Sequence, residues 1–144
     1  MVKDNIISDM DLAREMLLKT DYSIVVIKNN KILTKRRGVG IKPILEAIDE
    51  LNKSIYGSVI GDRILGKASA LLCRYANVKG VYSPQATKTA IAILIMADIP
   101  SQIDQMVPYI KNRDGDGVCP FEEMLKGVES PDEAYYILKK KVLK

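Results

Sequence analysis

Segments with helical periodicity alternate with short apolar runs along this chain, and the alternation constrains the fold more than any other feature. Residues 9–19 carry apolar side chains three or four positions apart, after a capping box that begins at Ser8, and therefore predict an amphipathic helix. Residues 22–27 are rich in β-branched side chains, Asn29-Asn30 supplies a turn, and residues 32–34 resume the strand pattern. The order predicts a helix followed by a β-hairpin with a buried first strand.

The same alternation continues through the rest of the chain. Helical spacing predicts a second helix over about residues 41–51 and a third over about residues 62–76, with a loop or short strand at residues 54–61 between them. Residues 78–82 predict a strand, and Ser83-Pro84 combines a helix cap with a first-turn proline, so a fourth helix follows and completes a βα unit. The remaining predicted elements are a strand at residues 103–107 and two terminal helices, one opening at Cys119-Pro120 and one at Ser130-Pro131 with a capping box completed by Glu133.

Length and composition favour one ordinary globular unit. The chain has 144 residues, of which 47% are hydrophobic and 28% charged, enough for one sizeable core and too few for two. We therefore predict a single three-layer α-β-α domain over residues 1–144, with a mixed sheet of four or five strands. No apolar run reaches the ~20 residues of a membrane-spanning helix. The amino terminus lacks a signal-peptide pattern, so we expect a cytoplasmic protein with reduced thiols and no membrane partner.

The chain contains no histidine. This absence excludes Ser-His-Asp triads, Cys-His dyads and His-ligated zinc, and with them most familiar hydrolase mechanisms. The two cysteines, Cys73 and Cys119, cannot form a four-sulfur site. We therefore expect no metal and no cofactor.

Two segments approach known cation or phosphate motifs without completing them. Residues 61–67 fit the first seven positions of a phosphate-binding loop, but Ala68 stands where a Ser or Thr would hold magnesium. Residues 112–123 have the spacing of a calcium-binding loop, but Pro100 and Pro108 interrupt the helix that would have to enter it. A turn stabilised by Asp and Gly is favoured over a cation site, and whether this loop binds a cation stays open.

Basic residues are concentrated in one segment. The net charge is +4, and the one dense run is Lys35-Arg36-Arg37, with Lys28, Lys31 and Lys42 nearby. Nucleic-acid binding through the Lys28 to Lys42 region is one hypothesis, and it predicts a steep salt dependence of association. Only 6% of the residues are aromatic, so no stacking platform accompanies the charge, and a solvated hairpin tip is the favoured interpretation.

A polar cluster stands out in the otherwise apolar middle of the chain. It contains Asp62, Gly66, Lys67 and Ser69, near the predicted start of the third helix. Small neighbouring residues leave room for a ligand to approach the backbone, and a lysine there can bind a phosphate or carboxylate. A surface lysine beside a close helix–sheet contact is the alternative. Cys73, among apolar neighbours in the same predicted helix, is expected to be a small core residue.

The second cysteine has a more reactive setting. If Pro120 is the first residue of a helix, Cys119 is its N-cap, where unpaired amides and the helix dipole favour a thiolate. Without a histidine, proton transfer would fall to a carboxylate such as Asp114 or Asp116. A nucleophilic role and a purely structural cap are both open for Cys119.

The order helix, hairpin, helix, loop, helix, strand, helix resembles the cytidine deaminase-like fold. In that family a His-Ala-Glu triplet at one helix start and a Pro-Cys-x-x-Cys motif at the next supply the zinc ligands and the proton-shuttling glutamate. Lys67-Ala68-Ser69 stands in place of the triplet, and residues 84–88 stand in place of the cysteine motif. The resemblance therefore implies the fold without zinc-dependent deamination.

Nearly the whole chain also resembles a family of small uncharacterised prokaryotic proteins assigned to that fold. This resemblance implies a fold and no established reaction. It rests on the strand at residues 22–28 with Asn29-Asn30, on residues 40–43, on residues 66–72, and on residues 107–110 through residues 112–115 to Cys119-Pro120.

The fold implies a pocket over the carboxyl ends of the strands, where successive helix starts converge. We expect a small anionic or nucleotide-like ligand there. A hydrolase- or transferase-like reaction and a non-catalytic binding or regulatory module are both open, and a homo-oligomer is compatible with the sequence. The predicted catalytic residues are Lys67, Asp114 and Cys119, and the predicted ligand-binding residues are Asp62, Gly66, Lys67, Ser69, Ser83, Gln85 and Asp116.

Overall fold

The chain begins with a helix that packs on the hairpin following it. The structure, a computed structural model, describes residues 2–108 and 123–143. Helix α1 (Val2–Lys19) precedes strands β1 (Ile24–Lys28) and β2 (Lys31–Arg36). The buried carboxylate of Asp9 accepts hydrogen bonds from the backbone N–H groups of Asn29 (3.1 Å) and Asn30 (2.8 Å), both of which have positive φ. Asparagine tolerates that conformation, so α1 can hold a tight hairpin turn in place.

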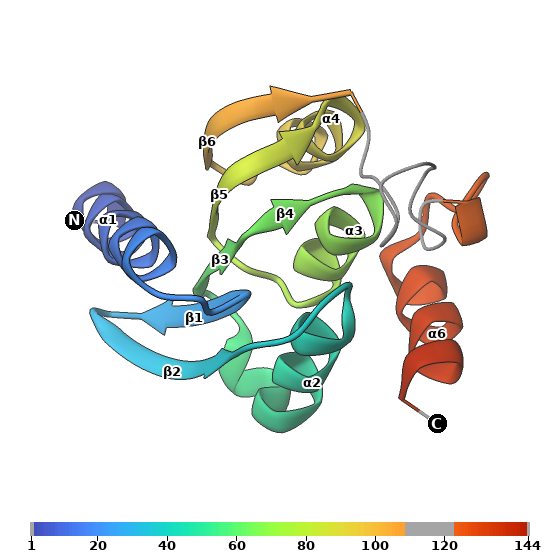
Figure 1. The fold of residues 1–144 in the computed structure, drawn as a ribbon, viewed down its shortest axis with the longest axis horizontal. Helices are drawn as coiled ribbons and strands as arrows, with labels where there is room; N and C mark the ends of the chain where they lie inside the picture. Colours follow the sequence, from blue (N-terminus) through green and yellow to red (C-terminus); the bar gives the residue numbers. More distant parts are fainter. Residues whose placement is uncertain (1, 109–122, 144) are drawn as a thin grey trace.

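Six strands form one mixed sheet in the described part of the chain. β1 is antiparallel to β2 and to β3 (Val59–Asp62), and β3 is parallel to β5 (Gly80–Thr87). β4 (Ile64–Leu65) pairs with β5 farther along, so that it continues the line of β3 (Figure 1). β6 (Ser101–Val107) pairs in parallel with the opposite edge of β5. β5 is therefore the strand that joins the two halves of the parallel region.

Helices cover the two faces of the sheet unequally (Figure 1). Apolar side chains of α1 pack on one face, against Val25, Ile27, Val59 and Tyr82. The other face is covered by α2 (Lys42–Leu51), a short 3-10 turn η1 (Asn52–Ile55), α3 (Lys67–Tyr75) and α4 (Lys88–Met96), and α6 (Pro131–Val142) packs against α3. The predicted three-layer α/β class is confirmed. The sheet exceeds five strands because β4 is a separate short strand on the line of β3.

The first helix starts earlier than predicted. α1 begins at Val2, so Ser8 and Asp9 lie inside the helix and the predicted capping box there is wrong. The Ser8 hydroxyl instead donates to the side-chain oxygen of Asn30 (2.7 Å), as Asp9 accepts from the same turn. Both polar side chains therefore form hydrogen bonds with the hairpin turn and do not cap the helix.

The third helix is shorter than predicted. β3 lies largely in the segment predicted as a loop or short strand, but β4 occupies residues 64–65, where the helix was predicted to have begun at about residue 62, and α3 starts at Lys67. Ile60 and Leu65 are fully buried in the sheet core. Short apolar runs that are buried on both faces do not distinguish a strand from a helix by periodicity, which accounts for the error.

Ser83-Pro84 lies inside β5 and does not cap a helix. The actual N-cap of α4 is Thr87, whose hydroxyl accepts a hydrogen bond from the backbone N–H of Ala90 (3.1 Å). Pro84 is tolerated in the strand because the pairing with β3 ends at Tyr82 and the pairing with β4 begins at Gln85. A residue without an N–H group removes no ladder hydrogen bond at that gap.

Other predicted elements are confirmed. α2 covers residues 42–51, β6 includes the predicted strand at residues 103–107, and Ser130 caps α6 by accepting from the N–H of Glu133 (3.3 Å). The helix predicted to begin at Cys119-Pro120 falls outside the described residues. None of the helices within residues 2–108 and 123–143 is long and apolar enough to cross a membrane.

Candidate functional site

The predicted polar cluster lies where β3 gives way to α3. β3 ends at Asp62, the two residues of β4 follow, and Gly66 leads directly into α3. Gly66 is buried, has an extended backbone, and offers no side chain to cap the helix. The strand and the helix therefore bring Asp62 and the first turn of α3 to one place, which we call the β3–α3 junction and define by Asp62, Gly66, Lys67 and Ser69.

Asp62 is the most perturbed acid of the described chain. Its side chain is buried, and burial raises the pKa of the carboxyl from 3.8 to about 7. Hydrogen bonding from Ser69 and from the backbone of Ile64 opposes the increase only in part. In the described residues no Lys or Arg forms an ion pair with this carboxyl. Asp62 can therefore gain or lose a proton close to neutral pH, which is a frequent property of functional carboxyl groups.

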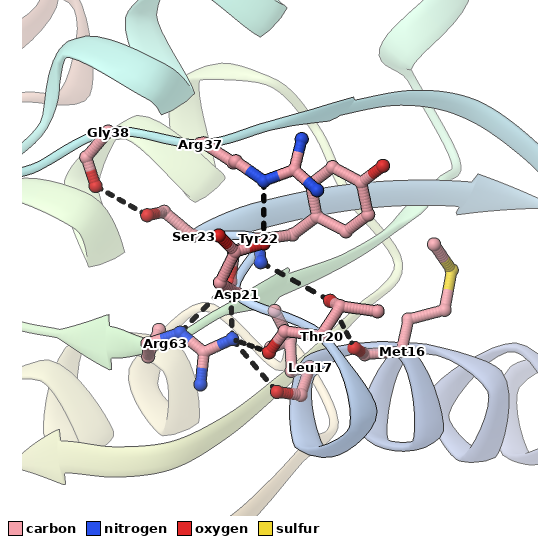
Figure 2. Close-up of polar contacts among 9 residues, drawn as sticks. All are labelled: Met16, Leu17, Thr20, Asp21, Tyr22, Ser23, Arg37, Gly38 and Arg63. Carbon is pink, nitrogen blue, oxygen red and sulfur yellow. Dashed lines mark hydrogen bonds and ion pairs between the residues drawn. The ribbon is translucent and has the colours of Figure 1, made fainter.

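Arg63 is adjacent to Asp62, but its guanidinium turns toward the carboxyl-terminal end of α1 (Figure 2). It donates to the backbone carbonyls of Leu17 (2.8 Å), Thr20 (2.9 Å) and Tyr22 (2.6 and 2.9 Å). These carbonyls lie at and beyond the end of α1, where helical C=O groups lack partners within the helix. The charge nearest to Asp62 in the sequence is thus engaged in holding α1, and it acts on the pKa of Asp62 only through a long-range attraction that lowers it.

Ser69 and Cys73 lie one helical turn apart on α3. Ser69 is 4% exposed and faces Asp62, while Cys73 is fully buried. Burial, with a further contribution from the negative charge of Asp62, raises the pKa of the Cys73 thiol well above its ordinary value. A neutral buried thiol is a poor nucleophile, so the prediction that Cys73 is a core residue is confirmed.

Lys67, the first residue of α3, is half-buried. Its ammonium group donates to the backbone carbonyl of Leu125 (2.9 Å), which is itself fully buried. Lys67 therefore connects the start of α3 to the segment that precedes α6, and it belongs to the edge of the β3–α3 junction.

Ser83 and Gln85, two predicted ligand-binding residues, lie on β5 next to this junction. The fully buried Ser83 hydroxyl donates to the backbone carbonyl of Gln85 (2.7 Å) and accepts from its N–H (3.2 Å). Gln85 is exposed and is the register partner of Ile64 in β4. Their ligand-binding roles stay predictions, with Ser83 already engaged within its own strand.

The structure thus brings together the four residues of the junction, with Gln85 on the adjoining strand. Asp114, Asp116 and Cys119 lie outside the described residues, as does most of the loop at residues 112–123, so their predicted roles stay predictions. Residues 61–65 are largely strand, which does not suit a phosphate-binding loop. In the part of the chain that the structure describes, no group of three His, Cys, Asp or Glu side chains could hold a metal ion.

The basic hairpin residues are engaged within the molecule. Arg36 forms an ion pair with Glu50 (2.7 Å), and Arg37 forms one with Asp21 (2.5 Å) while lying over the ring of Tyr22 (Figure 2). The ammonium of Lys35 also lies 5.2 Å from the centre of that ring. Such contacts are weak at exposed positions, yet they give this basic run a structural role.

Two open hollows lie away from the β3–α3 junction. One, of about 550 Å³, is lined by Arg74, Tyr75 and Ala97 at the carboxyl-terminal ends of α3 and α4 and by Asp132 of α6. The other, of about 580 Å³, lies on α6 and includes Tyr136 and Lys140. The pocket expected at the helix starts is therefore not one of these two hollows.

Sequence reasoning identified Asp62 but placed it in a helix and missed its burial. The available signal was the unbroken apolar run Val59-Ile60-Gly61 directly before it, because a carboxyl that ends a buried strand is often desolvated. The role of Arg63 was missed entirely. No local pattern reveals an arginine whose partners are carbonyls more than 40 residues away.

The chain is similar in sequence and in structure to one family of known proteins. Residues 12–142 match the family model described as TM1506, domain of unknown function (DUF1893). The crystal structure of a DUF1893 family protein (TM1506) from Thermotoga maritima is similar over 93% of this chain and 90% of that one, with a TM-score of 0.84 and 21% identity. The layered fold expected from the resemblance is confirmed by this match and by the observed topology.

Weaker matches add no functional information. Two crystal forms of RibD from Acinetobacter baumannii match 72% of this chain with TM-scores of 0.49 and 0.46 and identities of 15% and 16%. The aligned region spans about a third of the length of RibD, 35% and 36% in the two forms. No curated protein matches the chain significantly.

Proposed function

The chain belongs to the DUF1893 family, and we propose that its β3–α3 junction binds a small anionic or nucleotide-like molecule. The observation that carries the proposal is the buried pair formed by Asp62, at the end of β3, and Ser69, in the first turn of α3. Lys67 supplies a cation at the edge of the same junction. The description of the family assigns no ligand, so the proposal rests on these residues.

Burying a carboxyl without a cationic partner costs stability. Its persistence at a strand end, below a helix start, favours a functional reason over a structural one, since structural carboxyl groups are usually paired. Asp9, which is equally buried, has a structural reason, because it accepts from the N–H groups of Asn29 and Asn30 and so holds the hairpin turn. The hydrogen bonds of Asp62 come instead from Ser69 and the backbone of Ile64, at the junction itself.

The start of α3 favours a negative ligand. Backbone N–H groups in the first turn of a helix have no partner within the helix, and Gly66 provides no side-chain cap for them. A negative ligand close to Asp62 favours the protonated carboxyl, because two like charges repel each other. We therefore expect binding to take up a proton and to strengthen as the pH falls through about 7, the pKa of Asp62.

Isothermal titration calorimetry with inorganic phosphate, cytidine monophosphate and adenosine monophosphate tests the proposal. Lys67→Ala is expected to weaken binding about tenfold or more, which is ~1.4 kcal/mol. Lys42→Ala is the matched control, because Lys42 is the first residue of α2, is exposed, and should leave binding unchanged. Failure of all three probes to bind, or equal binding by Lys67→Ala, would contradict the proposal.

Proton uptake separates the role of Asp62 from simple charge attraction. Repeating the titrations at about pH 6 and about pH 8, in buffers of different ionisation enthalpy, measures the protons bound with the ligand. The wild-type chain should take up protons and Asp62→Asn should not. If Asp62→Asn takes up as many protons as the wild type, the carboxyl does not contact the ligand.

A chemical reaction at this site depends on residues outside the described ranges. Cys119, with Asp114, is the candidate nucleophile predicted from the sequence. The rate of alkylation of Cys119 against pH distinguishes an enzyme from a non-catalytic binding module. An ordinary thiol titration profile favours the binding module, and a profile shifted to low pH favours nucleophilic catalysis.

A further inference from the structure

α4 is more apolar than is usual for a helix that is partly exposed. Every residue from Ala90 to Met96 is apolar. A helix that is apolar on all sides is normally buried on all sides. In this structure only Ala90 and Leu94 of α4 are buried, whereas Ile95 is 64% and Met96 85% exposed. One side of the helix therefore lacks the cover that its composition requires.

The exposed residues of α4 form a single face. Ala90 and Leu94 are four residues apart and pack into the core, whereas the exposed residues lie on the opposite side of the helix. α4 lies at the rim of the molecule, beside β6 (Figure 1). We call this surface the outer face of α4, and it consists of Lys88, Thr89, Ala92, Ile95 and Met96.

We propose that the outer face of α4 binds a second copy of this chain, with the two α4 helices antiparallel about a two-fold axis. Lys88 is the first residue of α4 and Asp98 follows its C-cap, and both are exposed. Ala92 is in the middle of the outer face, four positions from both Lys88 and Met96. An antiparallel pair centred there places Lys88 of each copy at the carboxyl-terminal end of the other α4, close to Asp98. The outer face thus has a cation at one end and an anion just beyond the other, and these charges are complementary in a two-fold pair.

The helix dipole supports the same arrangement. Lys88 stands at the amino-terminal end of its own helix, where the partial positive charge is unfavourable for a cation. In the antiparallel pair it lies instead near the carboxyl-terminal end of the other helix, where a cation is stabilised. Ala92, at the crossing point, is small enough to let the two backbones approach closely.

The size of the surface sets the expected affinity. A nine-residue helix is about 13 Å long, so two such helices bury less than the ~800 Å² per partner of a stable interface. Association is therefore expected in the micromolar range. It is weak enough to be titrated at ordinary protein concentrations.

Sedimentation velocity from about 5 to about 200 μM protein tests the proposal. We expect a concentration-dependent dimer that Ile95→Glu abolishes. Ile7→Glu is the matched control, because Ile7 is 59% exposed on α1, on the other side of the sheet, and should leave the dimer unchanged. A chain that stays monomeric over the range, or a dimer insensitive to Ile95→Glu, overturns the proposal.

A charge exchange tests the geometry. Lys88→Glu or Asp98→Lys alone places like charges opposite each other and should raise the dissociation constant several-fold. The two changes in one chain restore opposite charges and should return the constant close to that of the wild type. If the loss of association free energy in the double variant equals the sum of the losses in the two single variants, the antiparallel pairing is contradicted. Circular dichroism confirms folding, which these exposed positions should preserve.

Cross-linking provides an independent measure of the axis. In a chain with Cys119→Ala, the change Ala92→Cys should give a disulfide-linked dimer under mild oxidation, since position 92 lies beside its own symmetry mate. Ile7→Cys in the same background should not. Equal cross-linking of the two variants overturns the placement of the two-fold axis.

Discussion

Asp62→Asn should abolish a pH dependence of stability that the wild-type chain shows between about pH 5 and about pH 8. The carboxyl has a pKa of about 7 in the folded chain and an ordinary value of 3.8. The folded state therefore binds more protons than the unfolded state between these two values. Stability is greatest below about pH 4 and falls as the pH rises through 7.

The magnitude follows from the size of the shift. Three pKa units correspond to a cost of about 4 kcal/mol once the carboxyl is ionised in both states. Roughly 2 to 3 kcal/mol of this cost appears between about pH 5 and about pH 8, because the unfolded chain is already ionised at the lower pH. Histidine is the side chain that ordinarily titrates between these pH values, and the chain contains none, so the change in stability can be assigned to Asp62.

Urea unfolding of the wild type, Asp62→Asn and Asp11→Asn at several pH values measures the effect. Asp11 is an exposed aspartate on α1 and serves as the control for removing one carboxylate. The free energy of unfolding should fall with pH for the wild type and Asp11→Asn, and should stay level for Asp62→Asn. A wild type equally stable at both ends of the interval, or an Asp62→Asn variant with the wild-type slope, refutes the reasoning.

Three further changes test contacts that hold α1 to the sheet. Arg63→Ala should destabilise the chain by roughly 2 kcal/mol in urea unfolding, because the carbonyls of Leu17, Thr20 and Tyr22 lose their donor, and Arg63→Lys should recover little since an ammonium cannot span them. Asp9→Ala should cost about 2 kcal/mol in thermal unfolding and speed amide exchange at Asn29 and Asn30, whereas Asp11→Ala should do neither. Gly61→Ala should lower the free energy of unfolding by roughly 1 to 3 kcal/mol, because an added Cβ would lie 2.8 Å from Val25 Cγ2 and 3.1 Å from Ala13 Cβ. Gly80→Ala should cost less, since the atom nearest to its added Cβ is at the flexible end of Met10. Equal losses of the two variants in urea unfolding would contradict this difference.

Elements that carry their own local signal were predictable from the sequence. α2 has a clear apolar stripe with Pro43 in its first turn, and Ser130 with Glu133 marks the start of α6. The hairpin turn at Asn29-Asn30 was equally clear, because both residues adopt positive φ. Local propensity and tertiary structure agree at these positions.

Elements whose environment overrides the local signal were not predictable. Ser83-Pro84 has the form of a helix cap, yet it lies in β5, because the residues before and after it pair with β3 and β4 and Ser83 pairs with Ile103 of β6. Ser8 and Asp9 likewise resemble a cap and instead bind a turn 20 residues away. At the candidate site, the grouping of Asp62, Lys67 and Ser69 was visible in the sequence. The burial that perturbs Asp62 depends on strands and helices that only the fold brings together.

Asp62 and Arg63 are neighbours that serve opposite sides of the sheet, one facing α3 and the other holding α1. Side chains in a strand alternate between faces, so the length of this segment matters as much as its composition. Deleting one residue between Gly61 and Ile64 would exchange the two faces and shift the pairing of β4 with β5, even though few atoms are lost. In relatives of this chain the spacing between β3 and α3 should therefore admit substitution but not insertion or deletion.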